Sequence, residues 1–157
     1  MKPKKPHMWV DGRRPTSTPV YPDDIGREKY KRLTMFNRPL RRLDAPVSYW
    51  WGDQVITVHP GFLTDFSSIP RIPMLWRVVG RYGLHDAAGV IHDALCRFGK
   101  YSEKEADLIW MWCSIDNGMP PWRARLAHRL GLRLAAPFRR HGYEANGDSS
   151  LLVIKKV

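Results

Sequence analysis

The sequence lacks the features of a secreted or membrane-spanning protein. It has only two cysteines, Cys96 and Cys113, in 157 residues, too few for the disulfide framework of a small secreted domain. The longest uninterrupted apolar run is residues 108–113, whereas a membrane helix needs about 20 residues. The N-terminus is basic, but no apolar stretch follows it, so we expect no signal peptide. A hydrophobic content of 43% instead favours one globular domain with its own core.

Acidic residues are scarce in both flanks of the chain. The formal net charge is +11. Residues 1–42 carry twelve Lys or Arg and four acids, and residues 119–143 carry six arginines and no acid. Residues 43–118 have six basic and nine acidic residues. We therefore expect the flanks to serve attachment and any chemistry to belong to the acidic centre.

Three parts of the chain follow from these patterns. Residues 1–28 are basic and rich in proline, which predicts an extended arm. Residues 29–143 contain the periodic apolar segments and form the predicted globular domain. Residues 144–157 are predicted to be a C-terminal tail with a late strand at residues 151–155.

The globular part is predicted to be an α+β fold. Val47–Trp51 and Gln54–Val58 flank Gly52-Asp53, which is typical of a β-hairpin with a two-residue turn. Apolar periodicity and capping signals predict helices at residues 70–79, 84–98, 103–117 and 120–136. We expect a small antiparallel hairpin or sheet to pack on these helices, with residues 84–98 and 103–117 as an antiparallel pair at the core.

This helix pair contains the residues best suited to chemistry. His-Asp occurs at 85/86 and at 92/93, and two helical turns between the histidines are too far for one shared metal ion. Folding about the short connection places Asp107 level with His92 and Asp93. A carboxylate on so apolar a helix needs a partner. His92 and Asp107 then form either a general base oriented by a carboxylate or a polar clamp between core helices.

A second polar cluster lies at residues 61–71. Its Thr64, Asp65, Ser67 and Ser68 precede a proline, so they either cap the helix that follows or present Asp65 to the His92 site.

Three blocks of the sequence resemble a phage-encoded family of unknown function. The blocks are G-F-L-T-D-F-S-S-I-P at residues 61–70, A-A-G-V-I-H-D-A-L at residues 87–95 and A-D at residues 106–107. Members of that family occur in bacteriophage and prophage genomes, so the resemblance implies a viral protein. Cys96 stands where the family usually has tyrosine.

The helix pair is also similar to that of the secreted calcium-dependent phospholipases. The similarity implies that His92 activates water, that Asp93 binds a divalent cation such as calcium and that Asp107 orients the imidazole. The chain departs from these enzymes at Cys96, and it lacks their glycine-rich calcium loop and their disulfide scaffold.

Basic residues form two expected contact surfaces. The residues predicted to contact partners or phosphates are Lys2, Lys4, Lys5, Arg13, Arg14, Arg123, Arg125, Arg129, Arg133, Arg139 and Arg140. The helical arginines share their helix with His128 and with Leu126, Leu130 and Leu134, which we expect to form its core stripe. Protein neighbours in an oligomeric assembly are the expected partners. Nucleic acid would be bound only through phosphates, because no base-reading motif accompanies the charge.

Two functions are consistent with the sequence. The favoured one is a virion-associated structural or assembly component, in the tail or at the head–tail junction, that grips neighbouring subunits with the arm and the arginine-rich helix. The alternative is a small phage hydrolase that acts on the bacterial envelope through His92, Asp93, Asp107 and Asp65, which would have to converge at an open pocket. Either protein would be found in the virion or the host cytoplasm.

Overall fold

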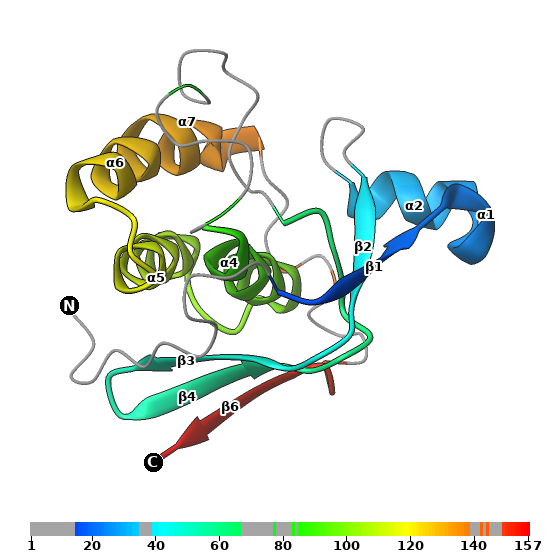
Figure 1. The fold of residues 1–157 in the computed structure, drawn as a ribbon, viewed down its shortest axis with the longest axis horizontal. Helices are drawn as coiled ribbons and strands as arrows, with labels where there is room; N and C mark the ends of the chain where they lie inside the picture. The colour runs from blue at the N-terminus through cyan, green and yellow to red at the C-terminus, as the bar shows by residue number, and fades with distance from the viewer. Residues whose placement is uncertain are drawn as a thin grey trace.

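The fold consists of two small antiparallel sheets and a set of packed helices, as Figure 1 shows for this computed structural model. The structure describes residues 15–34, 39–66, 77, 83, 85–138, 142, 144 and 149–157. One sheet has the order β1-β2-β5, made of Ser17–Val20, Leu40–Leu43 and Leu63–Thr64. The other has the order β3-β4-β6, made of Val47–Trp51, Gln54–Val58 and Leu152–Lys156. The α+β class is confirmed.

The β3–β4 hairpin forms where the turn residues predict it. Trp51 pairs with Gln54, so Gly52 and Asp53 alone make the turn. Gly52 has a φ of +64°, which only glycine adopts without strain. The C-terminal strand is also present, one residue later than predicted, and it pairs with β4 along Leu152–Lys156.

The central helix pair consists of α4, Asp86–Phe98, and α5, Glu103–Asp116. Gly99 ends α4 in the left-handed conformation, and its N–H donates to the Leu95 carbonyl. Ser102 begins α5 with a capping box, in which its side chain and that of Glu105 bond each other's backbone N–H groups. Both ends of the connection lie where the sequence predicts them.

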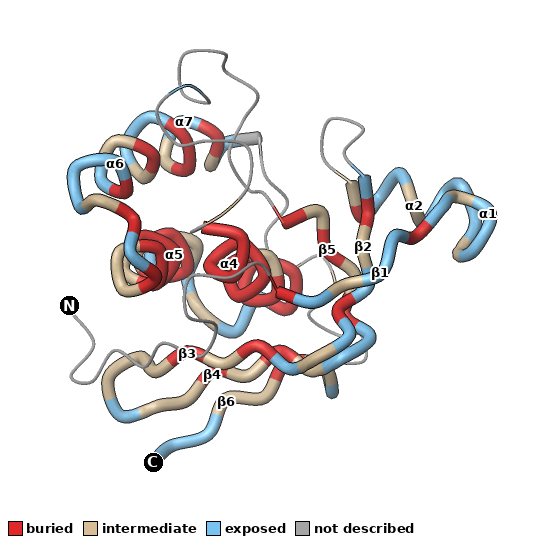
Figure 2. Tube along the Cα trace, viewed as in Figure 1, coloured by how far each residue is buried: buried red, intermediate tan, exposed pale blue. Residues whose placement is uncertain are grey.

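The helices and the β3-β4-β6 sheet form layers around one core (Figures 1 and 2). Helix α4 packs on the sheet, where Val47, Tyr49, Ile56 and Val58 are buried. Helix α5 packs beside α4, and the third helix packs on α5. Helix α4 is buried along nearly its whole length, so a polar side chain on it must find its partner inside the protein.

The third helix is continuous but changes its winding. It comprises α6, Pro121–Leu126, a π-helical segment η1, Ala127–Leu132, and α7, Arg133–Ala135, before a 3₁₀ turn η2 at Ala136–Phe138. The predicted core stripe of Leu126, Leu130 and Leu134 is wrong. Leu126 is half-buried, Leu130 is 43% exposed and Leu134 is 59% exposed.

Small residues and Leu132 face the core in place of those leucines. Ala124, Ala127 and Ala135 are buried, as is Gly131, and this side packs on α5. One turn of a π-helix contains more residues than one turn of an α-helix. The segment η1 therefore also changes which side of the helix Leu130 and Leu134 occupy.

Residues 15–28 form regular secondary structure where their prolines predict an extended arm. Within residues 15–28, β1 pairs with β2, and a short helix α1, Pro22–Ile25, precedes α2, Arg27–Leu33. Val20, Leu33 and Leu40 make a small second core there. Proline is compatible with this structure because Pro22 occupies the first turn of α1.

Several predicted features lie outside the described residues. They are residues 1–14 of the arm and, apart from Arg77, the helix at residues 70–79. Among the residues that are described, no helix is long and apolar enough to cross a membrane.

Candidate functional site

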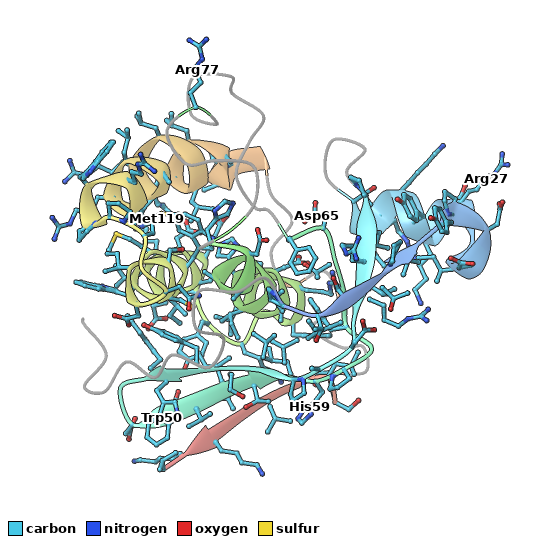
Figure 3. All side chains as sticks on the ribbon, in the orientation of Figure 1. Arg27, Trp50, His59, Asp65, Arg77 and Met119 are labelled. Carbon is cyan, nitrogen blue, oxygen red and sulfur yellow. The ribbon has the colours of Figure 1, made fainter. Side chains whose placement is uncertain are left out.

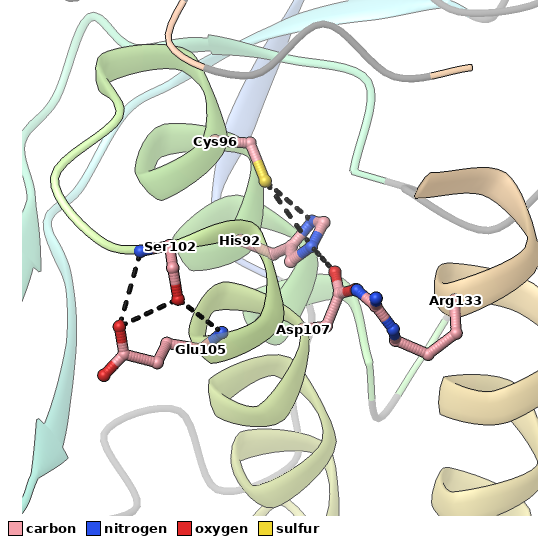
Figure 4. A network of polar contacts seen from close by, with 6 residues as sticks. All are labelled: His92, Cys96, Ser102, Glu105, Asp107 and Arg133. Atoms are coloured by element: carbon pink, nitrogen blue, oxygen red, sulfur yellow. Dashed lines mark hydrogen bonds and ion pairs between the residues drawn. The ribbon is translucent and has the colours of Figure 1, made fainter. Parts of the chain in front are cut away.

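The two helices of the central pair meet at His92 and Asp107, as the sequence predicts (Figure 4). The Nε2 atom of His92 lies 2.7 Å from Oδ1 of Asp107. The His92 side chain is 1% exposed and that of Asp107 is fully buried. The imidazole and carboxylate therefore satisfy each other away from water, which makes their bond costly to break.

Arg133 completes this cluster from the third helix. Its Nη1 atom lies 2.8 Å from Oδ2 of Asp107, and its side chain is one-third exposed. The carboxylate thus accepts on both of its oxygens, from two different helices. Arg133 was predicted to contact a partner or phosphate, whereas its guanidinium binds Asp107 inside the protein.

The bond to Asp107 fixes the tautomer of a neutral His92 ring. A carboxylate bonded to a guanidinium only accepts hydrogen bonds, so Nε2 of His92 carries the proton and donates. The lone pair is then on Nδ1. Cys96, one turn along α4, places Sγ 3.6 Å from Nε2 and 4.0 Å from Nδ1. With Nε2 bonded to Asp107 and the lone pair on Nδ1, the ring has the orientation that a general base acting through Nδ1 would need.

His128 is a titratable neighbour of the cluster that the sequence assigned only to the basic helix face. It lies in η1 and is half-buried. The pKa of His128 is lowered, and burial is the largest cause. Asp107 opposes this effect by raising the pKa, and three neighbours lower it further: Arg133, Arg129 and His92. The π-helical winding of η1 has no simple sequence signature, so the position of His128 beside this cluster could not be predicted from residue spacing.

Asp93 belongs to a different side of α4 from His92. Its Oδ2 atom accepts from Nη2 of Arg97 at 3.1 Å, and its side chain is 20% exposed. The same Arg97 nitrogen donates to the Leu63 carbonyl at 2.6 Å, and its guanidinium lies 4.2 Å from the centre of the Phe62 ring. Arg97 is thus an internal anchor for the segment after β4, a role that its place in the sequence did not indicate.

The loop that carries Asp65 crosses α4 on the Asp93 side. Thr64 Oγ1 accepts from the Phe66 N–H at 3.0 Å, and Phe66 is held at a φ of +63°. A Cβ atom on Gly89, one turn before Asp93, would clash with the Phe66 carbonyl oxygen. Asp65 is half-buried between these residues and is labelled in Figure 3.

The four predicted catalytic residues therefore lie around two different sides of α4. The structure places His92 against Asp107, and it places Asp93 on Arg97 beside the loop that carries Asp65. Among the described residues, no group of three or more His, Cys, Asp or Glu side chains could hold a metal ion. Asp93 as a cation ligand remains a prediction.

The arginine-rich helix exposes a mixed basic and apolar surface. We define the α6–α7 face as the exposed residues Trp122, Arg123, Arg125, Arg129, Leu130 and Leu134. Figure 2 shows the outer side of this helix as exposed. Three of the four arginines predicted here are on that face. Lys2, Lys4, Lys5, Arg13, Arg14, Arg139 and Arg140 lie outside the described residues.

A family model matches residues 41–130, which is more than half of the chain. The chain belongs to the family described as "Protein of unknown function (DUF1353)". The DUF1353 segment runs from β2 to η1 and contains His92, Asp93, Asp107 and Asp65, whereas Arg133 lies just beyond it. No curated protein and no solved structure matches the chain.

Proposed function

We propose that this protein is a virion-associated component of a bacteriophage, in the tail or at the head–tail junction, that grips neighbouring subunits through the α6–α7 face. The observation that carries the proposal is the exposure of Trp122, Leu130 and Leu134 beside three arginines on one helix. Large apolar side chains on a helix are normally buried. Tryptophan and arginine are enriched in protein interfaces and dominate their binding energy.

In this proposal the buried cluster positions the docking helix. Asp107 on α5 accepts from Arg133 on α7 and from His92 on α4. One carboxylate thereby ties three helices together. Such a clamp supports the α6–α7 face as a rigid surface, which lowers the entropy cost of binding a partner.

Mass spectrometry of purified particles of the phage that encodes the chain tests this function. We expect the polypeptide at a fixed copy number per particle. Phage carrying Leu130→Ser with Leu134→Ser should lose the polypeptide from particles and lose infectivity. Tyr21→Ser, at another exposed apolar residue, is the matched control and should change neither. Particles that never contain the polypeptide would rule out a virion component.

The orientation of the His92 ring is the observation behind a second candidate, a small hydrolase that acts on the bacterial envelope. This candidate requires the protein to open at the His92 side chain, which is 1% exposed. Because Nε2 donates to Asp107, Nδ1 is the atom that would take a proton from water. Asp107 would orient the ring, and Arg133 would be a positioning residue that holds Asp107. Asp93 would bind a cation after release from Arg97, and Asp65 lies on the same side of α4.

Hydrolysis of envelope substrates tests this candidate. The purified chain is incubated with phospholipid vesicles or with peptidoglycan, with calcium or with a chelator, and ester or glycan products are measured. We expect His92→Gln to abolish turnover, and His59→Gln, outside the cluster, to retain it. Absence of turnover by the unaltered chain on every substrate, or equal turnover by His92→Gln, would eliminate the hydrolase.

A further inference from the structure

Exposed apolar side chains are concentrated on the third helix. Among the described residues, five large hydrophobic side chains are exposed: Tyr21, Trp122, Leu130, Leu134 and Val157. Three of the five belong to the α6–α7 face. Trp122 and Leu134 are each more than half exposed, so their burial against a partner would remove substantial apolar surface from water.

The π-helical segment brings these three side chains toward one line. In an unbroken α-helix, Leu130 would be rotated by about 80° and Leu134 by about 120° from Trp122. Because η1 winds more residues into each turn, it rotates both leucines back toward the side of Trp122. The resulting apolar row extends roughly 18 Å along the helix axis, which is about three turns of a partner helix.

A row of positive charge runs beside the apolar row. Arg123, Arg125 and Arg129 are exposed, and the Arg123 guanidinium lies 5.3 Å from the centre of the Trp122 ring. Residues 119–143 contain no acid that could neutralise these charges locally. A partner that carries carboxylates or phosphates would complement this face.

The leucines distinguish protein from nucleic acid as the partner. Phosphate contacts need only the arginines, and the backbone of a duplex offers no apolar surface to cover Leu130 and Leu134. An amphipathic helix offers both, with apolar side chains on one side and acids on its rim. The opposite side of the third helix is fixed to α5 through its small residues and Arg133, so the face is preorganised.

We infer that the α6–α7 face binds an acidic amphipathic helix of a neighbouring protein, whose apolar side chains cover Trp122, Leu130 and Leu134 while its carboxylates pair with the arginines. This inference rests on the proposed assembly function and names the chemistry of its partner.

Fluorescence anisotropy with the full chain tests the inference. The probe is a fluorescein-labelled 16-residue peptide with leucines at helical spacing and glutamates elsewhere. A second peptide replaces each leucine by serine at the same net charge, and the third probe is a 20-base-pair DNA duplex. Two double variants of the chain are compared, Leu130→Ser with Leu134→Ser, and Arg125→Gln with Arg129→Gln. The controls are Tyr21→Ser and Arg27→Gln with Arg32→Gln, which alter exposed residues elsewhere. Circular dichroism verifies that each variant is folded.

We expect the leucine peptide to bind at least about tenfold more tightly than the serine peptide, and each α6–α7 double variant to lose about tenfold in affinity or more. The controls should bind as the unaltered chain does. Equal binding of the two peptides would overturn the inference. It would also be overturned if the duplex bound more tightly than the leucine peptide and if Leu130→Ser with Leu134→Ser did not change the affinity for the duplex. The latter result would assign the face to nucleic acid.

The two proposals fail separately. If the polypeptide is present in particles but does not bind the leucine peptide, the proposed assembly function stands and the inferred partner is wrong. Specific peptide binding by a chain that is absent from particles keeps the docking chemistry and removes the virion role.

Discussion

The Phe66 carbonyl lies so close to Gly89 of α4 that no side chain fits between them. This contact explains how two separate parts of the family segment depend on each other. Phe66 ends the G-F-L-T-D-F run in a left-handed conformation, and Gly89 lies three residues before His92. The loop that carries Asp65 is thereby fixed to the helix that carries the His-Asp pair.

Gly89→Ala should destabilise the protein although alanine is the better helix former. Helix propensity alone favours alanine by about 1 kcal/mol, but the added methyl group would clash with backbone that cannot move cheaply. We expect the free energy of unfolding, measured in urea, to fall by about 3 kcal/mol. Gly99→Ala is the comparison, because placing alanine in the left-handed conformation of this C-cap should lower the free energy of unfolding by only about 1–2 kcal/mol. A smaller loss for Gly89→Ala than for Gly99→Ala would contradict the close approach.

Arg133→Met should cost more stability than the same change at an exposed arginine. Removing the guanidinium takes away a charged donor of the buried Asp107 carboxylate, so we expect a loss of about 1–3 kcal/mol. Arg129→Met, on the α6–α7 face, should change stability by less than about 0.5 kcal/mol. In a double-mutant cycle with Asp107→Asn, the coupling energy of Arg133 should be about 1 kcal/mol or more. Additive effects would mean that the ion pair does not form in solution.

His128 should make the folded state sensitive to mild acid. Burial lowers the pKa of His128 in the folded protein, whereas an unfolded histidine titrates near about 6.5. Between these two pKa values the unfolded chain binds more protons, so stability falls as the pH drops below about 6.5 and stops falling below the folded pKa. The free energy of unfolding should decline less steeply for His128→Gln over that interval. An NMR titration of the His128 ring gives the folded pKa directly, and a value at or above that of an unfolded histidine would refute the effect.

Neither cysteine should react with thiol reagents while the protein is folded. Cys96 and Cys113 are free and buried, and burial together with Asp116 raises the pKa of the Cys113 thiol above its ordinary value. We expect dithionitrobenzoate to modify both thiols at least about 100-fold more slowly than in denaturant. Cys96→Ser isolates the reaction of Cys113. Rapid modification of Cys113 in the native Cys96→Ser protein would show that the α5 core opens locally.

Local chemistry allowed some elements to be predicted from the sequence. Gly52-Asp53 specified the hairpin turn, and Gly99 and Ser102 with Glu105 specified the ends of α4 and α5. The pairing of His92 with Asp107 could also be predicted, because a short connection fixes the register of two neighbouring helices and a buried carboxylate needs a donor. Arg133 as second donor to Asp107 could not be predicted, since it depends on the winding of a helix that is remote in sequence.

The sequence by itself determined the α+β class, the His92–Asp107 pair and the division of charge between basic flanks and an acidic centre. Each follows from local patterns or from neighbours along the chain. Only the tertiary structure decided which side of each helix faces inward. It brought the Leu63 carbonyl to Arg97, the partner of Asp93, and it buried alanines and Leu132 where Leu126, Leu130 and Leu134 were expected. The reason is that the apolar periodicity of a helix is compatible with more than one buried side. Packing selects the side whose side chains fill the core and whose buried polar groups are all hydrogen-bonded.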